Sequence, residues 1–137
     1  ELERRGLKGS VAMGRFHLLR ARVLGLERKY AEAVDACNES LESTAYIDRF
    51  EVFRTLADIR RRMGDTERAL DACSEALSIN NNNPFALLTL VRIYHQRNDA
   101  QMTREIAGRL QVLWSKADPD FYPLLELRAI LGGRSPS

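Results

Sequence analysis

The string AVDACNESL at residues 33–41 returns almost unchanged as ALDACSEAL at residues 69–77. The two strings start 36 residues apart, and a second match extends the pattern: RMGDTERAL at 62–70 aligns with QRNDAQMTR at 96–104 at a separation of 34. A fixed period of about 20 to 50 residues is typical of stacked supersecondary units that bury a core together. The sequence therefore predicts three copies of one structural unit.

Apolar residues within each copy recur at helical spacing. In the second copy one stripe runs from Phe50 to Met63 and another from Ala69 to Leu77, each with steps of three or four residues or their sums. Gly64-Asp65 separates them, since Gly takes the left-handed conformation at a helix end and Asp opens the next turn. Asn83 and Pro84 suit the start of the following helix. Each copy is therefore expected to be two antiparallel helices joined by a tight turn.

The repeat pattern sets the expected organisation of the chain. We expect a lead-in at 1–10, repeats at about 11–46, 47–82 and 83–115, a C-terminal capping helix at 116–133 and a disordered tail at 134–137. The capping helix is expected to start near Asp118 or Asp120 and to end at Gly132-Gly133. The best apolar stripe of the first helix comprises Ala12, Phe16, Leu19, Val23 and Leu26.

These residues resemble the tetratricopeptide repeats, whose pattern is W-x2-L-G-x2-Y, then A-x3-F, then P. The second copy matches with Phe53, Leu56, Ala57, Ala69, Cys73 and Ala76. The third matches with Leu87, Leu90, Val91, Tyr94, Thr103 and Ala107. The first matches with Ala21, Leu24, Ala33 and Cys37, but His17 and Arg20 stand where large apolar residues belong. The resemblance covers about residues 11–115 and implies an all-α fold, an α-solenoid of three helix-turn-helix repeats with a C-terminal capping helix.

In proteins of that family the first helices of successive repeats line a concave groove that holds a peptide or a partner helix. Carried over by register, the groove comprises Arg15, Arg22, Arg54, Asp58, Arg61, Phe85, Leu88, Arg92 and His95. Arg54, Arg61 and Arg92 are expected to pair with an acidic segment, since guanidinium binds carboxylate bidentately. Phe85 and Leu88 are expected to supply the apolar contact. The family's carboxylate clamp uses Asn and Lys where this chain has Arg22, Arg54, Asp58 and Arg92, which disfavours a chaperone tail as ligand.

Catalysis, metal binding and cofactor binding find no support in the sequence. His17 and His95 are a whole repeat apart and lie in no HExxH-like motif, so they are expected to be exposed or to line the groove. Cys37 and Cys73 occupy equivalent core positions and read as buried small hydrophobes rather than as a disulfide or zinc ligands. We therefore expect a non-catalytic protein-protein interaction module without cofactors.

Two alternatives remain open. A homo-oligomerisation or intramolecular role would use the apolar end of the first helix pair, giving a possible homodimer through the N-terminal repeat. Nucleic-acid binding would use the same arginines, but the net charge is only +2, so this partner is not expected.

The remaining expectations concern the environment of the chain. Charges interrupt every apolar run, so no membrane insertion is expected, and the location is expected to be cytoplasmic. The sequence starts without Met or a secretory signal pattern, which suggests a part of a longer protein.

Overall fold

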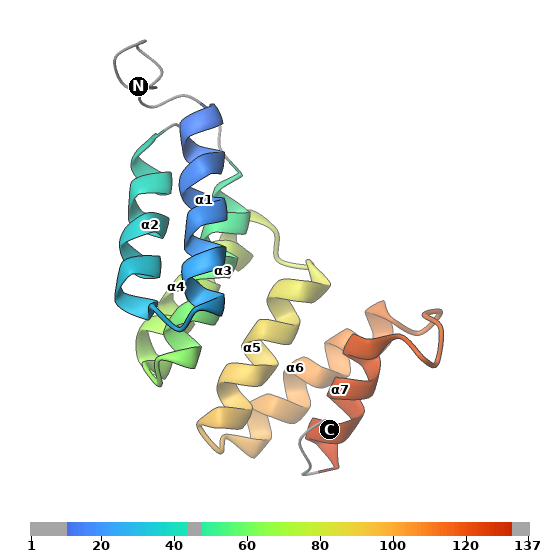
Figure 1. Ribbon diagram of the computed structural model, residues 1–137. Coiled ribbons are helices and arrows are strands. Elements are labelled where there is room, and N and C mark those ends of the chain that lie inside the picture. Colours follow the sequence, from blue (N-terminus) through green and yellow to red (C-terminus); the bar gives the residue numbers. More distant parts are fainter. Residues whose placement is uncertain (1–10, 44–47, 133–137) are drawn as a thin grey trace, which may run out of the picture. The chain divides into compact units, whose positions relative to one another are not determined.

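The structure is a computed structural model that describes residues 11–43 and 48–132. Within these ranges every helix or strand element is an α-helix, which confirms the all-α helical-repeat class (Figure 1). The helices are α1 (Val11–Leu26), α2 (Tyr30–Ser43), α3 (Arg49–Arg62), α4 (Thr66–Ile79), α5 (Pro84–Gln96), α6 (Ala100–Leu113) and α7 (Tyr122–Leu131). The expected lead-in at 1–10 and tail at 134–137 lie outside the described residues.

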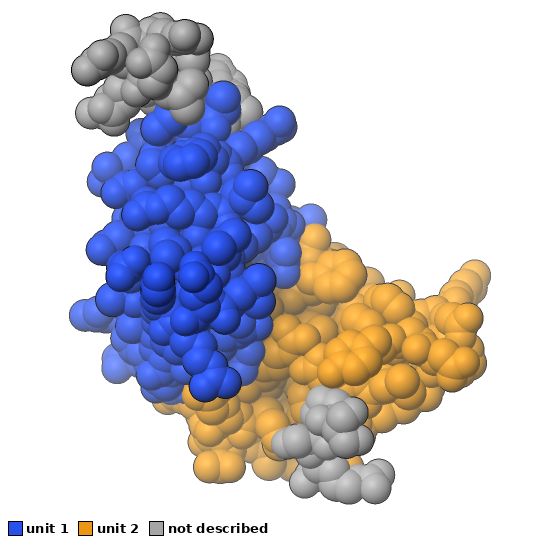
Figure 2. Space-filling model, in the orientation of Figure 1, with its two compact units in different colours: residues 1–80 blue, residues 81–137 orange. Residues whose placement is uncertain are grey.

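The helices pack as consecutive hairpins. They fall into two compact units, which Figure 2 colours separately. Unit 1, residues 1–80, holds the pairs α1–α2 and α3–α4, and α3 also packs on both α2 and α1. Unit 2, residues 81–137, holds the pair α5–α6, on which α7 packs. Helix α3 contacts its hairpin partner α4 and also both helices of the preceding hairpin, α1 and α2. It therefore buries residues on two sides, among them Val52, Leu56, Ala57 and Ile59.

The same backbone turn closes all three hairpins. Arg28, Gly64 and Asn98 have positive φ angles of 62°, 87° and 61°, and they lie 36 and 34 residues apart, the two periods of the repeat. After each of them the next N–H donates to the carbonyl five residues earlier, at 2.9 to 3.0 Å: Lys29 to Leu24, Asp65 to Arg60 and Asp99 to Tyr94. This bonding satisfies carbonyls that a helix end otherwise leaves without partners.

Side-chain caps start four of the helices. Asp65 accepts from the N–H of Arg68, and Asn83 accepts from the N–H groups of Phe85 and Ala86 ahead of a helix that begins at Pro84. The roles predicted for Asp65, Asn83 and Pro84 are thereby confirmed. Asp48 and Asp99 cap α3 and α6 in the same way.

Short side chains allow neighbouring helices to approach closely. Ala57, Ala69 and Ala76 are fully buried, and so are Cys37 and Cys73 of the two repeated strings. Between α1 and α2 the Ser40 hydroxyl donates to the carbonyl of Gly14 at 2.8 Å, a bond that only a close approach permits. These contacts explain why the repeated strings carry alanine, serine and cysteine.

The predicted apolar stripe of the first helix is wrong. Ala12 is exposed, and Phe16, Leu19, Val23 and Leu26 are 51%, 63%, 49% and 77% exposed. The opposite side of α1 is buried through Met13, Leu18, Ala21 and Leu24. This side carries the matches of the tetratricopeptide pattern, and it is buried because α2 and α3 both pack on it.

The start of α7 also differs from the prediction. The helix begins after Phe121, whose side chain makes no capping bond, and Asp118 instead accepts from the N–H of Asp120 in the preceding turn. Leu124, Leu127 and Ile130 are buried and form the inner face of α7, whereas Leu125 and Leu131 are exposed. No helix among the described residues is long and apolar enough to cross a membrane.

Candidate functional site

The predicted groove residues are divided between the two units. Unit 1 contributes Arg15 and Arg22 from α1 and Arg54, Asp58 and Arg61 from α3. Unit 2 contributes Phe85, Leu88, Arg92 and His95 from α5. The structure gives each set its own surroundings.

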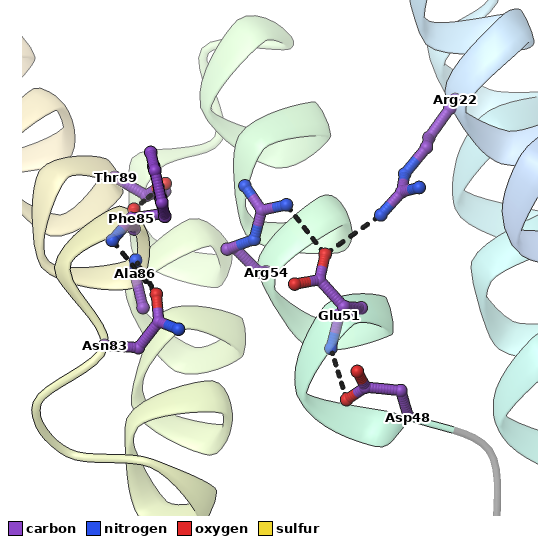
Figure 3. Close-up of polar contacts among 8 residues, drawn as sticks. All are labelled: Arg22, Asp48, Glu51, Arg54, Asn83, Phe85, Ala86 and Thr89. Atoms are coloured by element: carbon purple, nitrogen blue, oxygen red, sulfur yellow. Dashed lines mark hydrogen bonds and ion pairs between the residues drawn. The ribbon is translucent and has the colours of Figure 1, made fainter. Parts of the chain in front are cut away.

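In unit 1 the carboxylate of Glu51 lies between two arginines (Figure 3). Its Oε2 atom accepts from Arg22 Nη2 of α1 at 2.9 Å and from Arg54 Nη2, one turn further along α3, at 2.7 Å. The N–H of Glu51 donates to the capping Asp48, which fixes the start of the helix. One carboxylate oxygen thus serves two guanidinium groups, 45% and 31% exposed, and a positive charge is left over.

A second carboxylate that pairs with two arginines lies about two turns further along α3. Asp58 pairs with Arg61 at 2.8 Å through Oδ1 and with Arg62 at 3.0 Å through Oδ2. We call Arg22, Arg54, Arg61 and Arg62 the arginine cluster. In the part of the chain that the structure describes, these four guanidinium groups pair with the carboxylates of Glu51 and Asp58, so positive charges outnumber negative ones among these six groups. Arg15 of α1 lies exposed.

Arg92 does not have the role that the sequence predicts for it. Its Nε and Nη2 atoms donate to the two carboxylate oxygens of Glu126 on α7, each at 2.5 Å. Glu126 is only 8% exposed, so this bidentate pair sits inside unit 2 and joins α5 to α7. The Arg92 guanidinium group is therefore already bonded to a carboxylate of the protein itself, in the bidentate geometry that was predicted for a ligand.

Phe85 and Leu88, which were predicted to supply the apolar contact, differ in their exposure. Leu88 is 2% exposed and belongs to the core, so its assignment as a ligand contact is wrong. Phe85 is 46% exposed, with its ring edge-on to Trp114 at 6.2 Å between centroids. Trp114 in turn contacts Phe121 at 5.3 Å. An aromatic side chain held by a neighbour but open on one face is suited to contact a ligand.

The two histidines lie in different environments. His17 of α1 is largely buried and not exposed, with its Nδ1 atom 3.1 Å from Oε2 of Glu39 on α2. His95 lines a pocket of about 320 Å³ in unit 2, together with Asn98, Ala100, Thr103, Arg104, Ile130 and Leu131. No group of three His, Cys, Asp or Glu side chains in the described ranges is arranged to hold a metal ion.

The two cysteines are buried, as predicted, and no disulfide joins them. Burial raises the pKa of Cys37 and of Cys73 from 9.0 to about 12. For Cys37 the charges of Arg22 and Arg60 oppose this rise in pKa without cancelling it. A thiol that stays protonated is a poor nucleophile and a poor metal ligand. The pair therefore serves packing.

Charge is segregated by helix in unit 1. The first helix of each pair is basic: α1 has three arginines and no acidic residue, and α3 has five arginines and two acidic residues. The second helix is acidic: α2 has four acidic residues and no Lys or Arg, and α4 has three acidic residues and one arginine. The near-neutral net charge of +2 conceals this separation.

Glu126 is the residue that the sequence interpretation missed. It lies 34 residues after Arg92, a separation equal to one of the two repeat periods. A search for opposite charges at that separation would have found the pair.

No protein-family model matches the chain. Three relatives are named photosystem I assembly protein Ycf3, all from Prochlorococcus marinus. The identity over 89 residues is 38% with the protein of strain MIT 9313, 32% with that of strain MIT 9303 and 30% with that of strain MIT 9211. Each match covers 64% of this chain and 51% of the relative, so the chain spans about half the length of the curated relatives it matches.

Proposed function

We propose that this chain is a tetratricopeptide-type interaction module, without catalysis of its own, that holds an extended acidic segment of a protein on the arginine cluster of unit 1. The observation that carries the proposal is the sharing of Glu51 and Asp58 among four arginines. The repeated hairpins, the common turn geometry and the buried small residues support the family assignment.

The electrostatics of the cluster favour a carboxylate ligand. Arg22 and Arg54 both bond to the same oxygen of Glu51, so each guanidinium keeps donors that one carboxylate cannot use. Their partial exposure lets a ligand reach them, and their internal partner holds them in place before binding. The carboxylate of a ligand would therefore be attracted by both Arg22 and Arg54, and no buried ion pair would have to break first.

The names of the relatives support an interaction role over a catalytic one. They are called assembly proteins, and a module that assembles a protein complex has to hold subunits by segments that are accessible before assembly. We therefore propose that the acidic segment belongs to a protein whose assembly this chain assists. A cytoplasmic location remains part of the proposal.

In unit 2 we retain Phe85 as an apolar contact, because it is half-exposed and held edge-on by Trp114. His95 remains a candidate through the pocket it lines. Arg92 and Leu88 are no longer proposed as ligand contacts, because Arg92 pairs with Glu126 and Leu88 is buried.

Nucleic-acid binding is the weaker alternative on the same surface. It would need an uncompensated run of cations along a phosphate backbone and aromatic rings on which bases stack. The four arginines of the cluster are interleaved with Glu51 and Asp58, carboxylates that phosphate repels.

The test is a titration of the full chain with two fluorescein-labelled peptides, one with alternating Glu and Gly and one with Lys in place of Glu. We expect the acidic peptide to bind and the double variant Arg22→Gln, Arg54→Gln to weaken it by about tenfold or more, as for charge partners at an interface. Gln is used because Glu would also repel Glu51. The matched control is Arg68→Gln with Arg128→Gln, two exposed arginines on α4 and α7.

Two results would contradict the proposal. One is equal binding of the acidic and basic peptides, and the other is equal weakening by the cluster variant and by its control. Binding that weakens with rising salt in the wild type, and less steeply in the cluster variant, would support it.

A further inference from the structure

Within unit 1 an ion pair on α3 is repeated after seven residues. Glu51 pairs with Arg54, three residues later, at 2.7 Å, and Asp58 pairs with Arg61, three residues later, at 2.8 Å. Seven residues are nearly two turns of an α-helix, so the two pairs lie on the same face of α3. At a rise of about 1.5 Å per residue, they are about 10.5 Å apart along the helix axis.

Each of these pairs has a further arginine beside it. Arg22 of α1 also bonds to the first carboxylate, at 2.9 Å (Figure 3), and Arg62 bonds to the second, at 3.0 Å. We call Arg22 with Arg54 the first anchor, and Arg61 with Arg62 the second anchor. Arg22 is 45% exposed and Arg62 is 41% exposed, so each anchor presents a cation that a ligand can reach. Two ligand carboxylates about 10 Å apart would therefore contact both anchors at once.

The surroundings of the anchors favour one ligand conformation. Val52, Leu56, Ala57 and Ile59 of α3 are buried, so they offer no apolar stripe on which a ligand helix would pack. A ligand strand would add to the edge of a sheet, but the described residues form helices and no strand. The polyproline II conformation needs neither partner, because its backbone makes no internal hydrogen bonds and stays solvated.

Polyproline II also has a period that matches the anchors. It has about three residues per turn and rises about 3.1 Å per residue, so residues i and i+3 lie on one side of it, about 9.3 Å apart. In a β-strand the residues that share a face are i and i+2, about 6.7 Å apart, or i and i+4, about 13.4 Å apart. The polyproline II distance differs from the anchor separation by about 1.2 Å, whereas either β-strand distance differs from it by about 3 Å or more.

We propose that the arginine cluster selects acidic segments in the polyproline II conformation whose carboxylates stand three residues apart, one for each anchor. This inference rests on the proposed function, in which the cluster binds an acidic segment. It adds the spacing and the conformation of the ligand, which the charge of the cluster alone does not determine. A segment with the same number of acidic residues at another spacing reaches only one anchor at a time.

The test uses the full chain and proline-rich peptides that act as rulers, since proline holds the polyproline II conformation. Each peptide contains two Glu and seven Pro, is blocked at both ends and carries the same dye. The two Glu stand two, three, four or six positions apart, and the last spacing keeps both carboxylates on one side at about 18.6 Å. We expect the three-residue spacing to bind about fivefold more tightly than each of the others, because only this spacing joins both anchors.

Removing either anchor should remove the preference for spacing. When both arginines of one anchor are replaced by Gln, the four peptides should bind within about twofold of one another, because a single anchor reads no distance. The control variant Arg68→Gln with Arg128→Gln changes two exposed arginines outside the cluster and should keep the wild-type preference. If the second-anchor variant loses helicity by circular dichroism, the single variant Arg62→Gln replaces it, since that side chain is 41% exposed, and should at least halve the preference.

Three results would overturn the inference. They are equal binding, or equal absence of binding, of the four rulers; an unchanged preference in a folded anchor variant; and tighter binding of an alanine-based helix with Glu at i and i+7, which has the anchor distance in helical form. The proposed function fails differently, when the flexible peptide of Glu and Gly, which adopts many spacings, binds no better than its Lys counterpart. Binding of that flexible peptide together with equal binding of the rulers would refute the inference alone.

Discussion

The pair between Arg92 and Glu126 predicts that a single substitution on α7 loosens that helix from the rest of unit 2. Replacing Glu126 with Gln keeps its shape but removes the charge that receives both Arg92 bonds. Breaking a fully buried ion pair costs about 3–5 kcal/mol, because the remaining charge is left without compensation. The Arg92 side chain is 30% exposed, so water recovers part of this cost, and we expect a loss of about 2 kcal/mol.

The loss should be local because α7 packs only on α5 and α6 among the described helices. Native-state hydrogen exchange of the α7 amides is therefore the assay, and about 2 kcal/mol corresponds to roughly 30-fold faster exchange. The control is Arg128→Gln, an exposed residue of the same helix. A double-mutant cycle of Arg92→Gln and Glu126→Gln should give a coupling energy of about 1.5–2 kcal/mol. Exchange in Glu126→Gln no faster than in Arg128→Gln would refute the reasoning.

Three further predictions concern stability. Lys29 stands where Asp65 and Asp99 cap the later hairpins, so Lys29→Asp should stabilise the protein by about 1 kcal/mol in urea unfolding, and an unchanged midpoint would contradict the equivalence of the turns. Gly108 lies inside α6 and a Cβ there meets nothing within 4 Å, so Gly108→Ala should stabilise by about 0.5–1 kcal/mol, whereas a loss would mean that the site is crowded. The buried thiols have a pKa of about 12 in the folded state and of 9.0 when unfolded. Their contribution to the free energy of unfolding is therefore complete below pH 9 and is lost as the pH rises from 9 towards 12. The loss is at most about 1.4 kcal/mol per thiol per pH unit. Urea midpoints at about pH 8 and pH 10 should therefore differ less in a Cys73→Ala variant than in the wild type, and equal differences would show that other groups cause the loss.

Local features of the fold were predictable because their causes lie within a few residues. Gly64 with Asp65 and Asn83 with Pro84 act through backbone conformation and short-range capping bonds, and the structure shows them as expected. The face of α1 was not predictable in this way. Periodicity detects an apolar stripe, but α1 has two, and which of them is buried depends on α2 and α3, which come later in the chain.

The candidate site shows the same limit. Register placed Arg54 and Arg61 correctly on α3, and their (i, i+3) partners Glu51 and Asp58 follow from helical spacing. The pairing of Arg92 and the burial of Leu88 depend on tertiary packing, which helical spacing within α5 does not report. Reading each helix alone therefore overestimated the number of arginines available to a ligand.

The segregation of charge between the helices of unit 1 has a kinetic consequence. Basic α1 and α3 are in contact with each other, while their hairpin partners α2 and α4 are acidic, so the unit carries an electric dipole across its hairpins despite its small net charge. Such a field turns an approaching acidic protein toward the basic side before contact and turns it away from the acidic side. Added salt should therefore slow association while leaving dissociation nearly unchanged. The arrangement selects the orientation of encounter, which a uniformly basic surface of the same affinity would not do.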